Sequence, residues 1–293
     1  MIETIVIQGP GRMGLALGAA LRRSGEVQRV LFQGRSMDPP PHPIFERSPS
    51  GAPGAEYRAG VLPPPGDAVA LIIAVPDSAL GEVAWDLANS GPPPPGCSAL
   101  HLSGALSTDV LSPLHAAGYS VGSLHPMQTV ADPWLSADRL TGIAFAIAGE
   151  PAAARVAHQL VNALNGMPLV IAATQRPVYH AAAVTASNYL VAVLASASRL
   201  LHAAGVPADQ TLPALLPLVR GTLDNLEQLG VPAALTGPIA RGDMDTVRLH
   251  LARLSPDDHT LYCALGREVL RLARQAGLDG QKADEMANLL GSG

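Results

Sequence analysis

Three glycines near the start of the chain have the spacing of a phosphate-binding loop. Gly9, Gly11 and Gly14 follow an apolar, β-type run at residues 5–7 and precede an apolar helical stretch, which gives the order strand, G-x-G-x-x-G, helix. The first glycine permits a tight turn, the second lets a pyrophosphate approach the backbone, and the third lets the helix pack on the strand. The motif predicts a dinucleotide site formed by Gly9, Pro10, Gly11, Arg12, Met13 and Gly14.

The residues after the second strand-like run indicate which dinucleotide binds. Sites specific for NAD place an acidic residue there to bind the ribose hydroxyls, but this chain has Gly34, Arg35 and Ser36. An arginine at this position can pair with the 2′-phosphate of NADPH, and Ser36 can donate a second hydrogen bond. The alternative is a solvated loop arginine. We predict NADPH as the cofactor.

Residues that follow the strands of a parallel sheet face a bound ligand, and several of them carry candidate side chains. Val75 and Pro76 are predicted to contact the cofactor, whereas Asp77 is predicted to cap the next helix. Ser103 offers a hydroxyl to a substrate oxygen or, alternatively, caps the helix that follows it.

His125 is the first candidate for acid catalysis among the nine histidines. Pro126 favours an extended backbone at the preceding residue, which lets the imidazole project over the nicotinamide region. A side chain with a pKa near neutrality can donate a proton to a carbonyl oxygen as hydride reaches the carbonyl carbon. The alternative is a histidine that is hydrogen-bonded to a loop carbonyl.

Two further candidates lie on the first helix of the second domain. His180 and Asn188 share one helix face. His180 is the second choice for the proton donor. Asn188 could bind a substrate carboxylate or hydroxyl, or else form a hydrogen bond to another helix. The predicted catalytic residues are therefore His125, Ser103, His180 and Asn188.

A loop at residues 235–243 is the candidate for binding a substrate carboxylate. Thr236, Gly237 and Arg241 place a hydroxyl, a loose backbone and a guanidinium together. Arg241 could instead pair with Asp243.

The elements that must position these residues alternate along the first part of the chain. Apolar runs at residues 4–8, 29–33, 68–75, 99–103, 120–124, 143–148 and 169–172 predict strands between helical stretches, the pattern of a mostly parallel sheet covered by helices. Residues 38–54 predict a loop rich in Pro, Ser and Gly. We expect an α/β domain at residues 1–174 and an all-α domain at residues 175–293.

The second domain is expected to begin with a long helix at residues 178–204. Ala, Val and Leu occupy nearly every side of this helix, so it should be buried in a bundle or in a dimer interface. No strand is predicted after it.

Composition argues against several classes of protein. A net charge of −5 and 3% aromatic residues argue against nucleic-acid binding, which needs a basic surface and stacking side chains. Cys97 and Cys263 lack metal-ligand spacing, so no metal is predicted. The apolar run at residues 68–75 is too short to span a bilayer, and the N-terminus lacks a signal-peptide pattern. We expect a cytoplasmic protein that acts on a small molecule and has no membrane partner.

Seven segments together resemble one family along nearly the whole chain: GPGRMG, GRS, VPD, HLSGAL, SLHPMQT, YHAAAVTASNYL and ALTGPIARGD. The chain resembles the Rossmann-like proteins that carry the domain of unknown function DUF2520, within the 6-phosphogluconate dehydrogenase-like superfamily. The resemblance implies an NADP-binding Rossmann domain, a helical DUF2520-like domain for substrate binding and dimerisation, and a homodimer formed through the C-terminal helices. Some members of this family are alternative ketopantoate reductases.

One departure from related enzymes affects the chemistry. The β-hydroxyacid dehydrogenases and the better-known ketopantoate reductases use a lysine on the first helix of the second domain, where this chain has Val184 and Thr185. The proton for a carbonyl reduction must therefore come from elsewhere, with His125 as first choice. Prephenate dehydrogenases, by resemblance, place a serine and a catalytic histidine similarly to Ser103 and His125.

We expect an NADPH-dependent oxidoreductase that reduces a small 2-keto acid, with ketopantoate as the specific substrate. The alternatives are an imine reductase, an enzyme similar to prephenate dehydrogenase, a deazaflavin-linked NADP oxidoreductase, and an NADP(H) sensor without catalysis.

Overall fold

The computed structural model describes residues 1–47 and 54–291, and these form two compact units, at residues 1–188 and 189–293. Of the loop predicted at residues 38–54, residues 48–53 lie outside the described part of the chain. The predicted domain boundary lies at residue 174, and the division between the compact units falls inside the long helix α6 (Arg176–Ala203).

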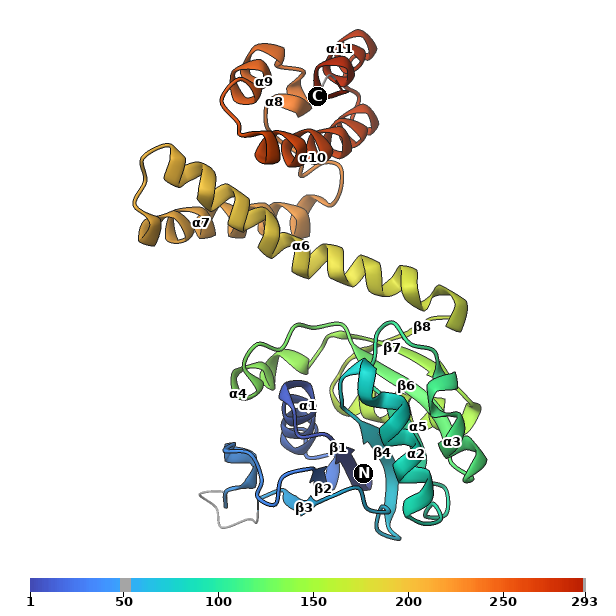
Figure 1. Cartoon of the computed structure of the whole chain (residues 1–293). Coiled ribbons are helices and arrows are strands. Elements are labelled where there is room, and N and C mark those ends of the chain that lie inside the picture. The colour runs from blue at the N-terminus through green and yellow to red at the C-terminus, as the bar shows by residue number, and fades with distance from the viewer. Residues whose placement is uncertain (48–53, 292–293) are drawn as a thin grey trace. The chain divides into compact units, whose positions relative to one another are not determined.

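The first unit contains one eight-stranded sheet with the order β3-β2-β1-β4-β5-β6-β7-β8, which is coloured from blue to green in Figure 1. All neighbouring strands are parallel except β6 and β7. The α/β prediction with a mostly parallel sheet is confirmed. The strands are β1 (Ile2–Gln8), β2 (Val27–Gly34), β3 (Glu56–Ala59), β4 (Ala68–Ile73), β5 (Ser98–His101), β6 (Ser120–Pro126), β7 (Ala144–Gly149) and β8 (Met167–Val170).

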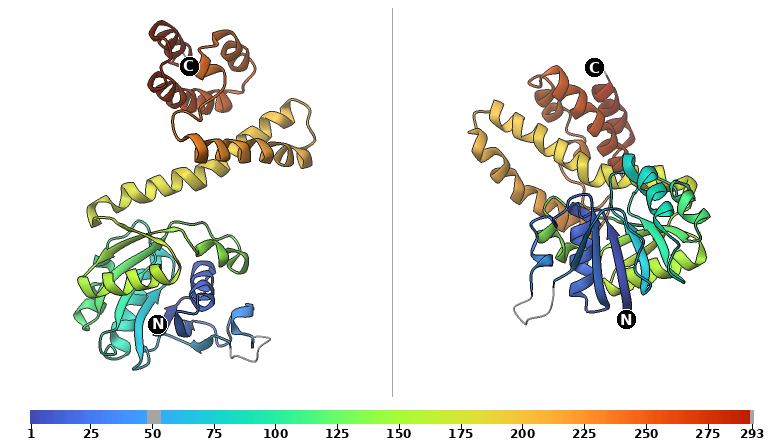
Figure 2. Two further views of the ribbon diagram at one scale, coloured as in Figure 1. Left: turned by 180° about the vertical axis from the view of Figure 1, so that it is seen from behind. Right: turned by 60° about the horizontal axis from the view of Figure 1, so that its bottom comes forward.

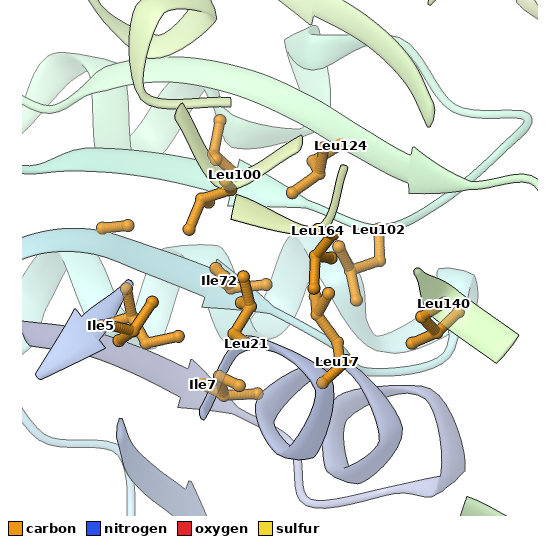
Figure 3. Packing of buried hydrophobic residues seen from close by; sticks show 14 of the residues in the cluster. Ile5, Ile7, Leu17, Leu21, Ile72, Leu100, Leu102, Leu124, Leu140 and Leu164 are labelled. Atoms are coloured by element: carbon orange, nitrogen blue, oxygen red, sulfur yellow. The ribbon is translucent and has the colours of Figure 1, made fainter. Parts of the chain in front are cut away.

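Helices cover both faces of this sheet, which explains why the central strands are continuously apolar. On one face, Ile5, Ile7 and Ile72 pack with Leu17 and Leu21 of α1 (Figure 3). This face is covered by α1 (Arg12–Arg23) and α5 (Pro151–Ala163), and the other by α2 (Leu80–Ser90) and α3 (Ser112–Ala116). The short helix α4 (Pro133–Ser136) packs against α1. Short 3₁₀ turns are η1 (Pro43–Phe45), η2 (Asp77–Ala79), η3 (Thr108–Leu111), η4 (Asp138–Leu140) and η5 (Ala173–Gln175).

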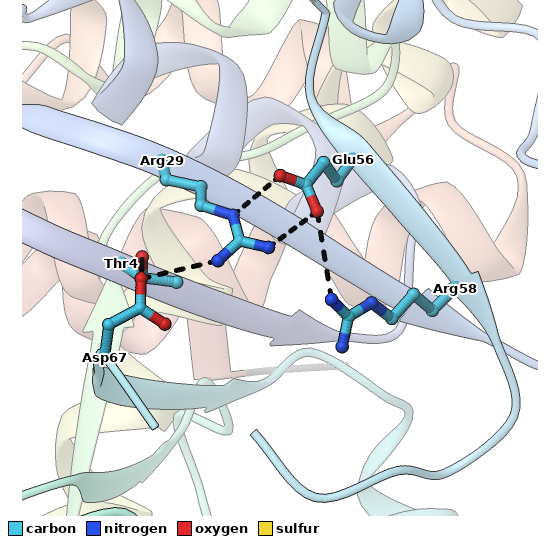
Figure 4. Close-up of polar contacts among 5 residues, drawn as sticks. All are labelled: Thr4, Arg29, Glu56, Arg58 and Asp67. Atoms are coloured by element: carbon cyan, nitrogen blue, oxygen red, sulfur yellow. Dashed lines mark hydrogen bonds and ion pairs between the residues drawn. The ribbon is translucent and has the colours of Figure 1, made fainter. Parts of the chain in front are cut away.

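The sequence analysis missed the edge strand β3. This strand has only four residues and none of them is fully buried, so it lacks the apolar run on which strand prediction depends. Its pairing with β2 is accompanied by ion pairs: Arg29 donates to both carboxylate oxygens of Glu56 at 2.7 Å, and Asp67 lies 3.4 Å from the same guanidinium (Figure 4). Backbone pairing with β2 and these ion pairs hold β3 in the sheet, since none of its side chains is fully buried.

The second unit is helical in the described residues, as predicted. Four helices, α8 to α11, surround a small core of Ile239, Val247, Leu270, Met286 and Leu290, and they gather at the C-terminal end of the chain in Figure 2. The helices of this unit after α6 are α7 (Ala208–Leu229), α8 (Pro238–Arg241), α9 (Met244–Leu251), α10 (Pro256–Gln275) and α11 (Gly280–Gly291).

The helix predicted at residues 178–204 is confirmed as α6, but its burial within a bundle of the chain is not. Within the chain its side chains are largely exposed, including Val178, Tyr189 and Val191 at 59–68%. By length and composition, one helical stretch of the described chain, Ala173–Ala203, is also apolar enough to cross a membrane. An apolar helix needs a cover, and the described residues leave these side chains exposed.

Candidate active site

The phosphate-binding loop adopts the conformation that its glycines predict. Gly9 has a positive φ of 104°, and a Cβ there would lie 2.7 Å from the carbonyl oxygen of Ala74. A Cβ at Gly14 would collide with the carbonyl of Gly9, so only glycine lets α1 approach β1 this closely. A Cβ at Gly11, by contrast, would meet nothing within 4 Å. The loop therefore leaves open space beside the first turn of α1, where backbone amides can bind a pyrophosphate.

The packing at the end of β2 explains why Gly34 stands there and not an acidic residue. A Cβ at Gly34 would lie 2.9 Å from both Pro10 and the hydroxyl of Tyr57, so those two side chains fill the space that an acidic residue would need. Tyr57, on the edge strand β3, donates a hydrogen bond to the carbonyl of Ser36 at 2.6 Å. Arg35 and Ser36 are exposed beside it, and among the described residues Arg35 forms no ion pair. The part of the chain that the structure describes thus leaves the Arg35 guanidinium without an ion pair, beside a carbonyl that Tyr57 holds.

The residues after β4 also reach this loop. Val75 lies against the loop, because its Cγ1 would be 2.9 Å from a Cβ at Gly9. Pro76 precedes the 3₁₀ turn η2. The prediction that Asp77 caps the next helix is wrong: its side chain makes no capping bond, and its carboxylate instead accepts a hydrogen bond from Ser103 at 2.8 Å. The Asp77 carboxylate thus binds the Ser103 hydroxyl in place of a backbone amide of the helix.

Ser103 is held on several sides. Its hydroxyl also accepts hydrogen bonds from the amides of Ala105 and Leu106, at 3.3 and 3.1 Å. The alternative that Ser103 caps the next helix is wrong, because Ser107 caps the turn η3 that follows. Its carbonyl accepts a hydrogen bond from Arg176. A direct role of this hydroxyl in catalysis stays a prediction.

Arg176, the first residue of α6, is completely buried. Its guanidinium donates to the hydroxyl of Ser123 at 2.8 Å and to the carbonyl of Ser103, while its Nε atom has no partner. Burial lowers the pKa of this guanidinium, yet an arginine stays charged in proteins. Among the described residues no carboxylate forms an ion pair with it, so its positive charge is only partly compensated.

His125 lies at the end of β6, next to α6. Its Nδ1 is 2.7 Å from the hydroxyl of Tyr179, and the two rings meet edge to face at 5.6 Å. The ring of His180 also lies edge to face with that of His125, at 5.7 Å between ring centroids. A Cβ at Gly104 would lie 2.8 Å from His125 Nε2 and still closer to His180 Nδ1. The two ring nitrogens therefore converge beside Gly104.

The expectation of a near-neutral pKa for His125 is wrong. Burial, the neighbouring His180 and the charge of Arg176 lower the pKa of His125 to about 4. Burial likewise lowers the pKa of His101, which is completely buried on β5, to about 4. His125 is consequently a neutral imidazole at physiological pH and can offer one N–H donor and one acceptor.

A pocket of about 670 Å³ opens beside His125 within the first unit. His180 and Asn188 also line it, together with largely apolar side chains such as Val130 and Val184. Three of the four predicted catalytic residues thus meet at one pocket. Asn188 is exposed, so the premise that it is buried and must find a partner is wrong.

Thr236, Gly237 and Arg241 belong to the second unit, and their role in substrate binding stays a prediction. Gly237 has a φ of 98° and precedes α8, and Arg241 is exposed at the end of that helix. The alternative pairing of Arg241 with Asp243 is not formed in the described structure. Asp243 caps α9 instead, accepting a hydrogen bond from the amide of Thr246 at 3.1 Å.

Sequence reasoning missed three residues of this site: Tyr57, Arg176 and Tyr179. A signal was present for Arg176, because a basic residue in the first turn opposes the positive end of the helix dipole and so indicates a special role. Tyr57 and Tyr179 carry no such signal, because their partners come from distant parts of the chain.

Two family models match the sequence. A Rossmann-like domain covers residues 58–126 and the domain of unknown function DUF2520 covers residues 143–269. No functionally curated protein has detectable sequence similarity to the chain.

Solved structures share the fold at low sequence identity. A protein from Thermotoga maritima is 22% identical with a TM-score of 0.69, and the match covers 93% of this chain and 99% of that one. A Bacteroides fragilis protein, named as a candidate NADP oxidoreductase, is 23% identical with a TM-score of 0.63 and coverages of 93% and 96%. Pyrroline carboxylate reductase from Plasmodium falciparum, solved with NADP bound, is 13% identical with a TM-score of 0.57 and coverages of 97% and 98%.

The order of the two matched domains agrees with the observed order of an α/β unit and a helical unit. The chain therefore carries a Rossmann-like domain followed by a DUF2520 domain.

Proposed function

We propose that this protein is an NADPH-dependent oxidoreductase. The observation that carries the proposal is that the cofactor loop and the His125 pocket lie at the same edge of one sheet. The glycine loop shaped for a pyrophosphate follows β1, and the pocket lies at the end of β6. Ligands of open α/β sheets bind at this edge. The fold is shared with a Plasmodium falciparum reductase solved with NADP bound, which supports the same class of cofactor.

The residues present fit NADPH better than NADH. Gly9, Gly11 and Gly14 would hold the pyrophosphate, and Arg35 and Ser36 would hold the 2′-phosphate, because Tyr57 and Pro10 exclude an acidic side chain at residue 34. When bound, the reduced nicotinamide supplies a hydride to the substrate carbon. The protein must then supply the proton, and we propose His125, which lines the pocket together with His180, as the donor.

An anionic substrate fits the electrostatics of the site. Arg176 places a buried positive charge behind Ser103 and Ser123, which favours a carboxylate in the adjoining pocket. The walls near Val130 and Val184 are apolar and suit a branched carbon chain. We therefore propose a small 2-keto acid as substrate and ketopantoate as the specific one. Binding of a carboxylate by Thr236, Gly237 and Arg241 of the second unit stays a prediction.

A substrate panel tests this function. Purified protein with NADPH should reduce ketopantoate faster than other 2-keto acids, cyclic imines or a deazaflavin. If only an imine or a deazaflavin is reduced, the protein is still a reductase, but the proposal of a 2-keto acid substrate is wrong. Oxidation of prephenate with NADP⁺ would instead favour a dehydrogenase. Tight NADPH binding without any turnover would favour a sensor.

We also propose that the protein acts as a homodimer through its C-terminal helices. Large apolar side chains on α6 and α7 are exposed, among them Tyr189, Val191, Leu218, Leu223 and Leu229. A second copy of the chain offers the same apolar surface and can bury it by two-fold symmetry. Light scattering should give the mass of a dimer, and V191D with L218D should give a monomer. A monomeric wild type, or one that sediments with lipid vesicles, would contradict the dimer.

A further inference from the structure

Tyr179 is the only protein group that hydrogen-bonds the His125 ring in the described structure. The tyrosine is buried, its hydroxyl lies 2.7 Å from Nδ1, and the rings are almost perpendicular, at 88°. This contact joins β6 to the first turn of α6. Whatever proton Nδ1 gains or loses therefore passes through the tyrosine hydroxyl.

The direction of this hydrogen bond follows from the buried hydroxyl. Among the described residues, Nδ1 of His125 is the only hydrogen-bond partner of the Tyr179 hydroxyl. A buried hydroxyl proton needs an acceptor, and burial raises the pKa of Tyr179, so the hydroxyl keeps its proton. Tyr179 therefore donates and Nδ1 accepts. The single proton of the neutral imidazole must then be on Nε2.

The Nε2 end of His125 is the end that reaches the pocket. It converges with Nδ1 of His180 beside Gly104, and His180 Nδ1 is buried without a hydrogen-bond partner. Both histidines line the 670 Å³ pocket. An oxygen of a bound substrate near this point would meet the Nε2–H donor directly.

We propose that Tyr179 is a positioning residue that fixes the Nε2–H tautomer of His125 and returns a proton to it during catalysis. This inference rests on the proposed reductase function. In the step, the carbonyl carbon gains a hydride from the reduced cofactor, which is oxidised, and the carbonyl oxygen takes the proton from His125 Nε2. Nδ1 takes the proton of the Tyr179 hydroxyl at the same time. The tyrosinate left beside Arg176 regains its proton from water.

Kinetics of Y179F test the relay, because this variant keeps the ring and removes the hydroxyl. We expect kcat to fall roughly 10- to 100-fold, less than for loss of the acid–base group itself, because His125 stays in place. KM and the NADPH dissociation constant should stay within about twofold. Y262F is the matched control. Tyr262 on α10 also pairs edge to face with a histidine, His250 on α9, and its hydroxyl lies 2.9 Å from Nδ1 of that histidine. An unchanged kcat in Y179F, or an equal loss in Y262F, would overturn the relay.

The tautomer itself can be measured without turnover. Nitrogen-15 NMR of the histidine rings in the NADPH-free protein should show His125 as Nε2–H in the wild type and as a mixture of tautomers in Y179F, with His180→Asn used to assign the signals. A wild-type His125 protonated on Nδ1 would overturn the inference. If the protein reduces no substrate but His125 has the expected tautomer, the proposed function fails and the assigned geometry survives.

Discussion

At the scale of single residues, the site depends on His125 being neutral. Replacing it in H125N should leave NADPH binding unchanged and lower kcat by about a hundredfold or more, because a general-acid proton is lost. H180N is the control and should lose less, since His180 contacts the pocket without the tyrosine partner. Stopped-flow turnover and fluorescence titration of NADPH measure both variants. A larger fall of kcat in H180N than in H125N, at equal NADPH affinity, would mean that His180 and not His125 is the proton donor.

Arg35 is the residue that should select the cofactor. R35D replaces a cation with a repelling carboxylate on the loop that Tyr57 holds. A charge-assisted pair contributes about 1.5–3 kcal/mol, so NADPH affinity should fall roughly 10- to 100-fold while NADH affinity changes little. Calorimetric titration with both nucleotides provides the measurement. An unchanged preference for NADPH would show that Arg35 does not bind the 2′-phosphate.

At the scale of elements, the edge strand β3 is the one that sequence patterns could not predict and the one that shapes the cofactor loop. Removal of its Tyr57 hydroxyl in Y57F frees the carbonyl of Ser36, so the loop should become less ordered. We expect NADPH to bind about 3- to 10-fold more weakly, as for loss of one neutral hydrogen bond, and NADH to bind as before. Equal weakening of both nucleotides would indicate a general loss of folding.

Other elements were predictable because their signals are local. The glycine loop, the apolar strands and α6 depend on residues near one another in sequence, and all lie where the patterns indicate. The His125–Tyr179 pair and the buried Arg176 depend on contacts 53–73 residues apart in sequence. A single sequence does not encode such contacts as a periodicity, so they emerge only in the folded chain.

At the scale of the whole molecule, buried histidines make stability depend on pH. The pKa of His101 is about 4 in the folded protein and about 6.5 when unfolded. As pH falls from 6.5 towards 4, only the unfolded chain takes up this proton, so the free energy of unfolding should decrease by up to about 3 kcal/mol. Above pH 6.5 this contribution is fully present.

Urea unfolding at pH 7 and pH 4.5 measures this dependence. H101N keeps an acceptor for the Ser103 amide, which Nδ1 binds at 3.1 Å, and removes the titrating ring. The loss of stability between the two pH values should therefore be smaller in the variant, although Arg176 and His125 still face the site. Parallel losses in both proteins would mean that His101 does not cause the dependence.

Transfer of deuterium tests most directly that the molecule as a whole is a reductase. NADPH deuterated at C4 on either face is incubated with the protein and ketopantoate, and the product is analysed by mass spectrometry. The account predicts one deuterium on the carbinol carbon of pantoate from one face of the cofactor only, and transfer that is about a hundredfold slower in H125N. Bound NADPH that transfers no deuterium to ketopantoate, to another 2-keto acid or to an imine would contradict it.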